Sequence, residues 1–175
     1  MARRSRKGPI PRSLLWLAPV LLLAACAVYL SSLPEVGYLR RENPRTTAFI
    51  ELHKDRMRAK GLKPTAPKTG APISSKSPDL VHAVIISEDD MFYLHKGVDW
   101  EALREAMKYN IEKRRPARGA STITQQLARN LFLSPSKNPL RKVKEYLIAR
   151  RLEKALSKRR ILELSLAHGV LCRYT

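Results

Sequence analysis

The sequence predicts a mainly α-helical protein behind a single N-terminal transmembrane helix. Two observations predict this. One uncharged run of twenty residues lies near the N-terminus, and apolar residues recur three and four positions apart from residue 78 onward. No segment alternates apolar and polar residues in the way that predicts a strand. With 175 residues, the chain has room for one modest domain and its extensions.

The uncharged run, residues 14–33, is about long enough to span a bilayer as a helix, and residues 1–13 form a basic tail. The basic residues of this tail indicate that it stays cytoplasmic. A cleaved signal peptide is the alternative, because "LAAC" (23–26) resembles a lipoprotein processing site. The residues after Cys26 stay apolar, however, so we expect an uncleaved, single-pass anchor.

Residues 34–79 are predicted to be a membrane-proximal segment followed by a proline-rich loop. Pro34 and Pro44 disfavour a long helix at the start of this segment. Residues 49–61 have the pattern of a short amphipathic helix that ends at a glycine. Four prolines lie between residues 62 and 79, which indicates a loop.

The main domain is placed at residues 80–164. Its first helix lies within "SPDLVHAVIISEDD" (77–90), where Ser77 or Asp79 could cap the start. After an irregular loop, Asp99 is placed to cap a second helix, "WEALREAMKYNIEK", whose apolar residues Trp100, Leu103, Met107 and Ile111 fall on one face.

A third helix lies in "RGASTITQQLARN" (118–130), where Ile123, Leu127 and Leu131 form a thin apolar stripe. Thr122 and Gln125 fit a capping box at its start. Capping does not explain the other uncharged polar residues: Ser121, Thr124, Gln126 and Asn130. Such amides and hydroxyls suit a surface that binds a neutral, hydroxyl-rich ligand such as a sugar. Arg118 and Gly119 before the helix would offer an anion site.

The clearest amphipathic helix is "LRKVKEYLIARRLEKAL" (140–156), and "SKRRILELSL" (157–166) begins another. The predicted core stripe of the first consists of Leu140, Val143, Leu147, Ile148, Leu152 and Leu156.

Charge limits the classes of partner. Lys and Arg number 34 against 15 Asp and Glu, a formal net charge of +19. This excess points to a nucleic acid, an anionic lipid or a phosphate-bearing substrate. Apolar residues make up 44 % of the chain, too many for wholesale disorder. From the placement of Cys26 and Cys172 we expect neither a structural disulfide nor a metal site.

Three acids, Glu88, Asp89 and Asp90, end an apolar helix, where each opposes the helix dipole at a cost of ~0.3–1 kcal/mol. A solvated helix end is one interpretation. The other is a partly buried carboxyl, whose raised pKa would suit proton transfer. A metal site built from these acids and His95 is a lesser alternative.

Glu145 is one of two acids among fifteen basic residues between residues 113 and 160. Spacing alone favours a salt bridge with Arg141 or Lys142. A second carboxylate that faces the first is the functional alternative.

Three stretches then resemble the first three motifs of the peptidoglycan glycosyltransferases: "EDDMFYLHKGVDW" (88–100), "RGASTITQQLARNLFLSP" (118–135) and "RKVKEYLIARRLE" (141–153). The similarity is closest to the monofunctional, membrane-anchored biosynthetic form. It implies a lysozyme-like glycosyltransferase domain with a large lobe, a smaller membrane-associated lobe and a cleft between them. It also implies an enzyme that polymerises lipid II into β-1,4-linked glycan strands and releases undecaprenyl diphosphate, for cell wall biogenesis and cell shape.

By this resemblance Glu88 would be the general base and Glu145 would assist near the leaving diphosphate. The residues implied in substrate binding are Ser121, Thr122, Gln125, Gln126, Arg141 and Lys142. Amides suit sugar hydroxyls and cations suit a diphosphate. The resemblance implies no required cofactor, although a divalent cation, Mg or Mn, could help the leaving group. No dedicated metal cage is visible.

The implied partners are lipid II, the growing strand, membrane lipids and other cell-wall synthesis proteins, with no nucleic acid. The implied location is the bacterial cytoplasmic (inner) membrane, with the catalytic domain on the periplasmic or extracellular side. The chain departs from the family pattern at residues 165–175, "SLAHGVLCRYT", which reads as an aberrant tail after a truncation or frameshift. A catalytically inactive anchored fragment is therefore one alternative, and a basic nucleic-acid-binding protein is a remote one.

Overall fold

The computed structural model describes residues 12–65, 72–115, 119–136 and 138–168, and it gives the side chains of all of these except residues 12–15. The chain divides into two compact units, Met1–Leu33 and Pro34–Thr175. The described part of the first unit is one helix, α1 (Arg12–Ser31), with Pro19 inside it. Among the described residues, no helix combines the length and the apolar character needed to cross a membrane. The anchor over residues 14–33 therefore stays a prediction.

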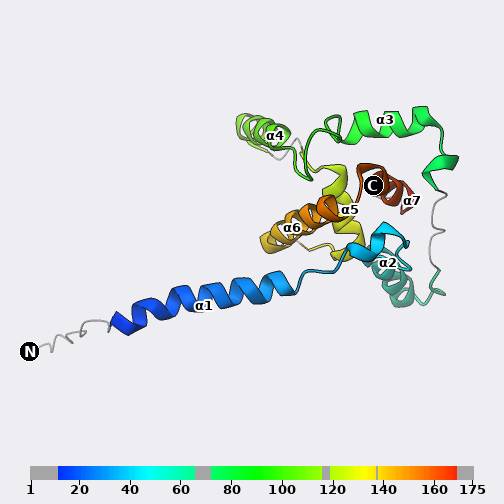
Figure 1. Ribbon diagram of the computed structural model, residues 1–175. Helices are drawn as coiled ribbons and strands as arrows, with labels where there is room; N and C mark the ends of the chain where they lie inside the picture. The colour runs from blue at the N-terminus through cyan, green and yellow to red at the C-terminus, as the bar shows by residue number, and fades with distance from the viewer. Residues whose placement is uncertain (1–11, 66–71, 116–118, 137, 169–175) are drawn as a thin grey trace, which may run out of the picture. The chain divides into compact units, whose positions relative to one another are not determined.

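The second unit is built from helices, and the residues described contain no strand, which confirms a mainly α-helical protein (Figure 1). In chain order the elements are η1 (Gly37–Arg40), α2 (Ala48–Ala59), η2 (Ile73–Ser75), α3 (Pro78–Glu88), α4 (Trp100–Glu112), α5 (Ile123–Phe132), α6 (Pro139–Ala155) and α7 (Lys158–Ala167), where η1 and η2 are 3₁₀ turns.

Side-chain caps set where most of these helices begin. Asp99 accepts a hydrogen bond from the backbone N–H of Ala102 at 2.8 Å, which confirms it as the cap of α4. Thr47, Asn138 and Ser157 do the same for α2, α6 and α7. Ser77 precedes α3 but makes no cap hydrogen bond. Pro78 follows it at the first helical position, where a fixed φ favours the helix without a side-chain cap.

Helix α5 lies at the centre of the core, where it packs against α6, α7 and α2 (Figure 1). Ile123 and Leu127 of α5, Ile148 and Leu152 of α6 and Ile161 of α7 are all completely buried. Each such aliphatic side chain stabilises the fold by about 1.5–3 kcal/mol through burial. The core therefore fixes the position of α5, and with it the polar side chains at its N-terminal end.

The predicted core stripe of α6 is wrong over the first part of the helix. Leu140 and Val143 are 60 % and 49 % exposed, whereas Glu145 is fully buried. The buried side of α6 contains Ile148 and Leu152 as expected, but it is rotated to include Glu145. A charged side chain accepts this position because two cations of the same helix compensate it.

The membrane-proximal segment is tied to the core by Arg160 of α7. Its guanidinium donates to the backbone carbonyls of Leu39 and Glu42 at 2.8 and 2.9 Å, and to Asn43 Oδ1 at 2.8 Å. Leu39 itself is completely buried. Residues 37–43 are thus part of the folded unit.

Candidate active site

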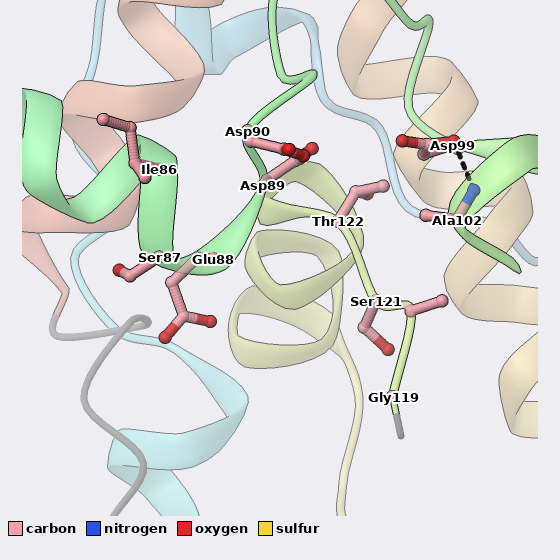
Figure 2. Close-up of a pocket in the computed structure, with 11 residues that line it drawn as sticks. Ile86, Ser87, Glu88, Asp89, Asp90, Asp99, Ala102, Gly119, Ser121 and Thr122 are labelled. Atoms are coloured by element: carbon pink, nitrogen blue, oxygen red, sulfur yellow. Dashed lines mark hydrogen bonds between the residues drawn. The ribbon is translucent and has the colours of Figure 1, made fainter. Parts of the chain in front are cut away.

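A cavity of about 290 Å³ lies where the end of α3, the start of α4 and the segment before α5 meet (Figure 2). Its polar lining includes Glu88, Asp99, Ser121 and Thr122, together with the backbone at Gly119. Of the predicted site residues, the structure brings Glu88, Ser121 and Thr122 into this cavity. Arg118 lies outside the described residues.

Glu88 is the last residue of α3 and is half-buried. Its Oε2 accepts a hydrogen bond from Gln126 Nε2 of α5 at 2.9 Å. Its Oε1 has no hydrogen-bond partner among the residues that the structure describes. One oxygen of this carboxylate is therefore fixed by the core helix, and the other is available to accept a proton.

Asp89 explains how an acid is tolerated at the end of α3. It is 7 % exposed, and its Oδ2 accepts a hydrogen bond from the backbone N–H of Ile123 at 2.9 Å. The carboxylate thus lies at the positive end of α5, which offsets its unfavourable place on α3. His95 Nε2 contacts both of its oxygens, at 2.8 and 3.1 Å.

His95 is not available as a metal ligand through either ring nitrogen. Nδ1 accepts a hydrogen bond from the backbone N–H of Gly97 at 3.1 Å, so Nε2 donates to Asp89. Among the described residues, no group of three or more His, Cys, Asp or Glu side chains could hold a metal ion. In this geometry both ring nitrogens of His95 take part in hydrogen bonds within the described structure.

The predicted capping box of α5 is confirmed. Thr122 Oγ1 accepts from the Gln125 backbone N–H at 3.2 Å, and Gln125 Oε1 accepts from the Thr122 backbone N–H at 3.1 Å. Thr122 Oγ1 also donates to the Gly97 carbonyl at 2.8 Å. Gln125 is occupied in this cap and does not line the cavity.

Glu145 forms both predicted salt bridges. Its oxygens lie 2.9 Å from Arg141 Nη1 and 2.6 Å from Lys142 Nζ. Lys142 Nζ also donates to Ser121 Oγ at 3.1 Å, which links this cluster to the cavity. The cluster carries two cations and one anion, and the Lys142 side chain is 49 % exposed. It therefore keeps a net positive charge with which to bind an anion.

Two features of the site were missed from the sequence. Gly97 has φ +92°, and a Cβ there would lie 3.1 Å from Glu153 Cγ, so the position needs glycine. A histidine and a glycine two residues apart in an irregular loop were the available signal. Arg129, three residues after Gln126 on α5, has no side-chain partner among the described residues. It is a further candidate cation on that side of the helix.

Comparison with known proteins gives the family. A family profile described as Transglycosylase matches residues 59–170. Biosynthetic peptidoglycan transglycosylases from Azoarcus sp. (strain BH72), Nitrosospira multiformis and Aromatoleum aromaticum are 40 %, 42 % and 47 % identical over 154, 132 and 124 residues. These matches cover 86 %, 75 % and 71 % of this chain, and 67 %, 57 % and 54 % of the relatives. The chain thus spans between about half and two thirds of the length of these relatives, and it belongs to the transglycosylase family.

Proposed function

We propose that the chain is an inverting peptidoglycan glycosyltransferase that polymerises lipid II into β-1,4-linked glycan strands. The main support for this proposal is the environment of the Glu88 carboxylate. The Glu88 carboxylate is held through one oxygen by Gln126, its other oxygen has no partner among the described residues, and it lines a cavity with the hydroxyls of Ser121 and Thr122. Family membership and the names of the relatives support the same reaction.

In the proposed step Glu88 takes the proton from the 4-hydroxyl of the acceptor sugar. The freed oxygen attacks the anomeric carbon of the lipid-linked donor, and the bond from that carbon to the diphosphate breaks with inversion. The leaving undecaprenyl diphosphate keeps the bonding electrons, and Arg141 and Lys142 offset its negative charge. Glu145 fixes both cations in place.

The test is polymerisation of purified lipid II in detergent by the full chain and by Glu88→Gln. Glutamine has the size of glutamate and can still accept the hydrogen bond from Gln126, but it cannot take a proton. We expect the rate to fall by about 10²–10⁴-fold. Asp79→Asn is the matched control, because it removes an exposed carboxylate from the other end of α3. Equal rates for Glu88→Gln and wild type would refute the base. No strands from wild type would favour the inactive-fragment alternative.

We also propose that the protein works at the bacterial inner membrane, anchored by residues 14–33, with its catalytic unit on the periplasmic side. Helix α4 supports contact with the membrane surface. Trp100, Met107 and Ile111 of α4 are 63 %, 57 % and 74 % exposed. Lys108 lies on the same helix, and Lys113 and the two arginines after it are exposed at its end. The helix also carries exposed Glu101, Glu105 and Glu112, so the cations at its C-terminal end are the ones that would favour an anionic lipid surface beside the apolar face.

Tryptophan fluorescence can report membrane contact by α4 separately from insertion of the predicted anchor. The chain has two tryptophans, so a Trp16→Phe background leaves Trp100 as the single reporter. Reconstitution into anionic vesicles should shift Trp100 emission to the blue, and brominated lipids should quench it. Neutral vesicles should give a weaker effect. Emission that is the same in detergent-free buffer and in anionic vesicles would contradict a membrane contact by α4.

A further inference from the structure

We propose that Lys158, the first residue of α7, is a positioning residue that holds the loop following the general base. This inference rests on the proposed function, because it assigns Lys158 a role in placing Glu88. Lys158 Nζ donates to the His95 carbonyl at 2.8 Å and to Glu153 Oε1 at 2.8 Å. It also lies 4.4 Å from the ring centroid of Phe92. One ammonium thus contacts two residues of the loop that begins at Asp89.

The place of Lys158 on its own helix does not explain the residue. A cation in the first turn of a helix opposes the helix dipole. Within the same turn, Arg159 is exposed and has no side-chain partner among the described residues, whereas the Lys158 side chain is 21 % exposed. The ammonium turns away from solvent toward the loop, so its contacts lie with distant residues.

The anchoring partner of Lys158 is itself buried. The Glu153 side chain is 8 % exposed, and its Oε1 also accepts a hydrogen bond from Thr124 Oγ1 at 2.6 Å. The Cγ of Glu153 lies 3.1 Å from where a Cβ on Gly97 would be. Glu153 thus connects α6 to α5 and lies directly against the loop. The ion pair places the Lys158 ammonium within hydrogen-bond distance of the His95 carbonyl.

A short series of contacts leads from this carbonyl to the general base. The ring of His95 donates to Asp89, whose carboxylate accepts from the backbone N–H of Ile123. Asp89 directly follows Glu88 in the chain. Loss of the hydrogen bond to the His95 carbonyl should therefore weaken the contact of Asp89 with the N-terminus of α5. The neighbouring Glu88 carboxylate should then be displaced. A displacement of about 1 Å at a catalytic group costs up to about 10²-fold in rate.

Kinetics of the full chain in detergent test the role in catalysis. Lys158→Met keeps an apolar stem against Phe92 and removes the ammonium. We expect kcat for lipid II polymerisation to fall by about 10- to 100-fold with KM changed by less than about twofold. Arg159→Met is the matched control, since it removes one charge from the same helical turn, and it should retain wild-type kcat. Equal kcat for the two variants would overturn the proposal.

Removal of Lys158 leaves the buried charge of Glu153 without its cation, which could unfold the protein. The double variant Glu153→Gln with Lys158→Met avoids this, because glutamine still accepts the hydrogen bond from Thr124. The double variant lacks the hydrogen bond to the His95 carbonyl. It should therefore stay folded and lose as much kcat as Lys158→Met does. A folded double variant with wild-type kcat would also overturn the proposal.

Nuclear magnetic resonance gives a readout that does not depend on activity. The chain has four histidines, and ring ¹⁵N labels report each tautomer. In the wild-type chain, His95 should show a protonated Nε2 and an accepting Nδ1. The double variant should shift or broaden the His95 ring signals and the Ile123 amide signal, and Arg159→Met should not. Unchanged signals would overturn the proposal even if wild type polymerises lipid II. If wild type does not polymerise, these signals alone decide whether Lys158 holds the loop.

Discussion

Helices α5 and α4 depart from the usual distribution of polar and apolar residues in opposite ways, because α5 also buries polar side chains and α4 exposes apolar ones. Thr124 and Gln126 of α5 are 0 % and 8 % exposed, although they are polar. Trp100, Met107 and Ile111 of α4 are 63 %, 57 % and 74 % exposed, although they are apolar. A buried polar side chain costs free energy unless it is hydrogen-bonded, and an exposed apolar patch marks an interaction surface. These two departures support the proposed active site at α5 and the proposed membrane contact at α4.

The hydrogen bonds of α5 show what its polar residues do. Thr122 binds the loop at Gly97, Thr124 binds Glu153 of α6, and Gln126 binds Glu88 of α3. Each of these three side chains connects α5 or its N-cap to a different segment. The sequence pattern had suggested that the amides bind a sugar directly. In the structure, the hydroxyls of Thr122 and Thr124 and the amide of Gln126 instead form hydrogen bonds with neighbouring segments of the protein.

The largest expected difference between the two helices is in stability. Leu127 of α5 is completely buried, so Leu127→Ala should lower the free energy of unfolding by about 2–5 kcal/mol. Met107 of α4 is 57 % exposed, so Met107→Ala should change it by less than about 0.5 kcal/mol. Denaturant unfolding of the full chain in detergent, followed by circular dichroism, measures both. Similar costs would mean that α4 packs against a part of the fold as tightly as α5 does.

Removing a charged side chain should also lower the free energy of unfolding more where that side chain is buried. The difference should be smaller than for Leu127 and Met107. Glu145 is fully buried, and its removal leaves Arg141 and Lys142 facing each other without an anion. Because these cations are 24 % and 49 % exposed, we expect Glu145→Ala to cost about 2 kcal/mol rather than the full value for a buried pair. The exposed pair between Asp55 and Arg58 is the control. Asp55→Ala should have an effect within about 0.5 kcal/mol in the same unfolding assay.

A third comparison is between two helix caps, of which only one also forms a hydrogen bond with a distant part of the chain. Thr122 caps α5 and also donates to the Gly97 carbonyl, whereas Ser157 caps α7 and is exposed. Thr122→Ala should cost about 1–2 kcal/mol and Ser157→Ala about 0.5–1 kcal/mol. Thermal unfolding under one set of conditions ranks the two variants. A larger cost for Ser157→Ala would show that the bond to Gly97 contributes nothing.

Local features of the fold were predictable because their causes lie within four residues. The capping box of Thr122 and Gln125, the cap at Asp99 and the salt bridges of Glu145 all follow from short spacing rules. The helices follow from the apolar period for the same reason. What the period does not determine is which side of an isolated helix meets the core, and this is why Leu140 was wrongly assigned to it.

The contacts that position Glu88 were not predictable from spacing. Gln126 is 38 residues from Glu88, Ile123 is 34 residues from Asp89, and Lys158 is 63 residues from His95. Such pairs depend on how α3, α5 and α7 pack, and a single sequence does not contain that information in local form. The unfavourable placement of three acids at the end of α3 was the available signal, and for Asp89 the compensating partners are now clear.

The last prediction concerns a buried polar side chain that, unlike those of Thr122, Thr124 and Gln126, makes no hydrogen bond within the described structure. The ring nitrogens of His168, at the end of α7, are buried and have no hydrogen-bond partner in the described structure. Burial lowers the pKa of His168 below its ordinary value, and the nearby positive charge of Arg160 lowers it further. The unfolded chain therefore binds the proton more readily than the folded chain. The stabilising contribution is complete above the ordinary histidine pKa of about 6.5, and it is lost as the pH falls through the folded value. We expect a lower unfolding midpoint at about pH 5 than at about pH 8, and a smaller difference in His168→Leu. An unchanged difference in His168→Leu would assign the pH dependence to other groups.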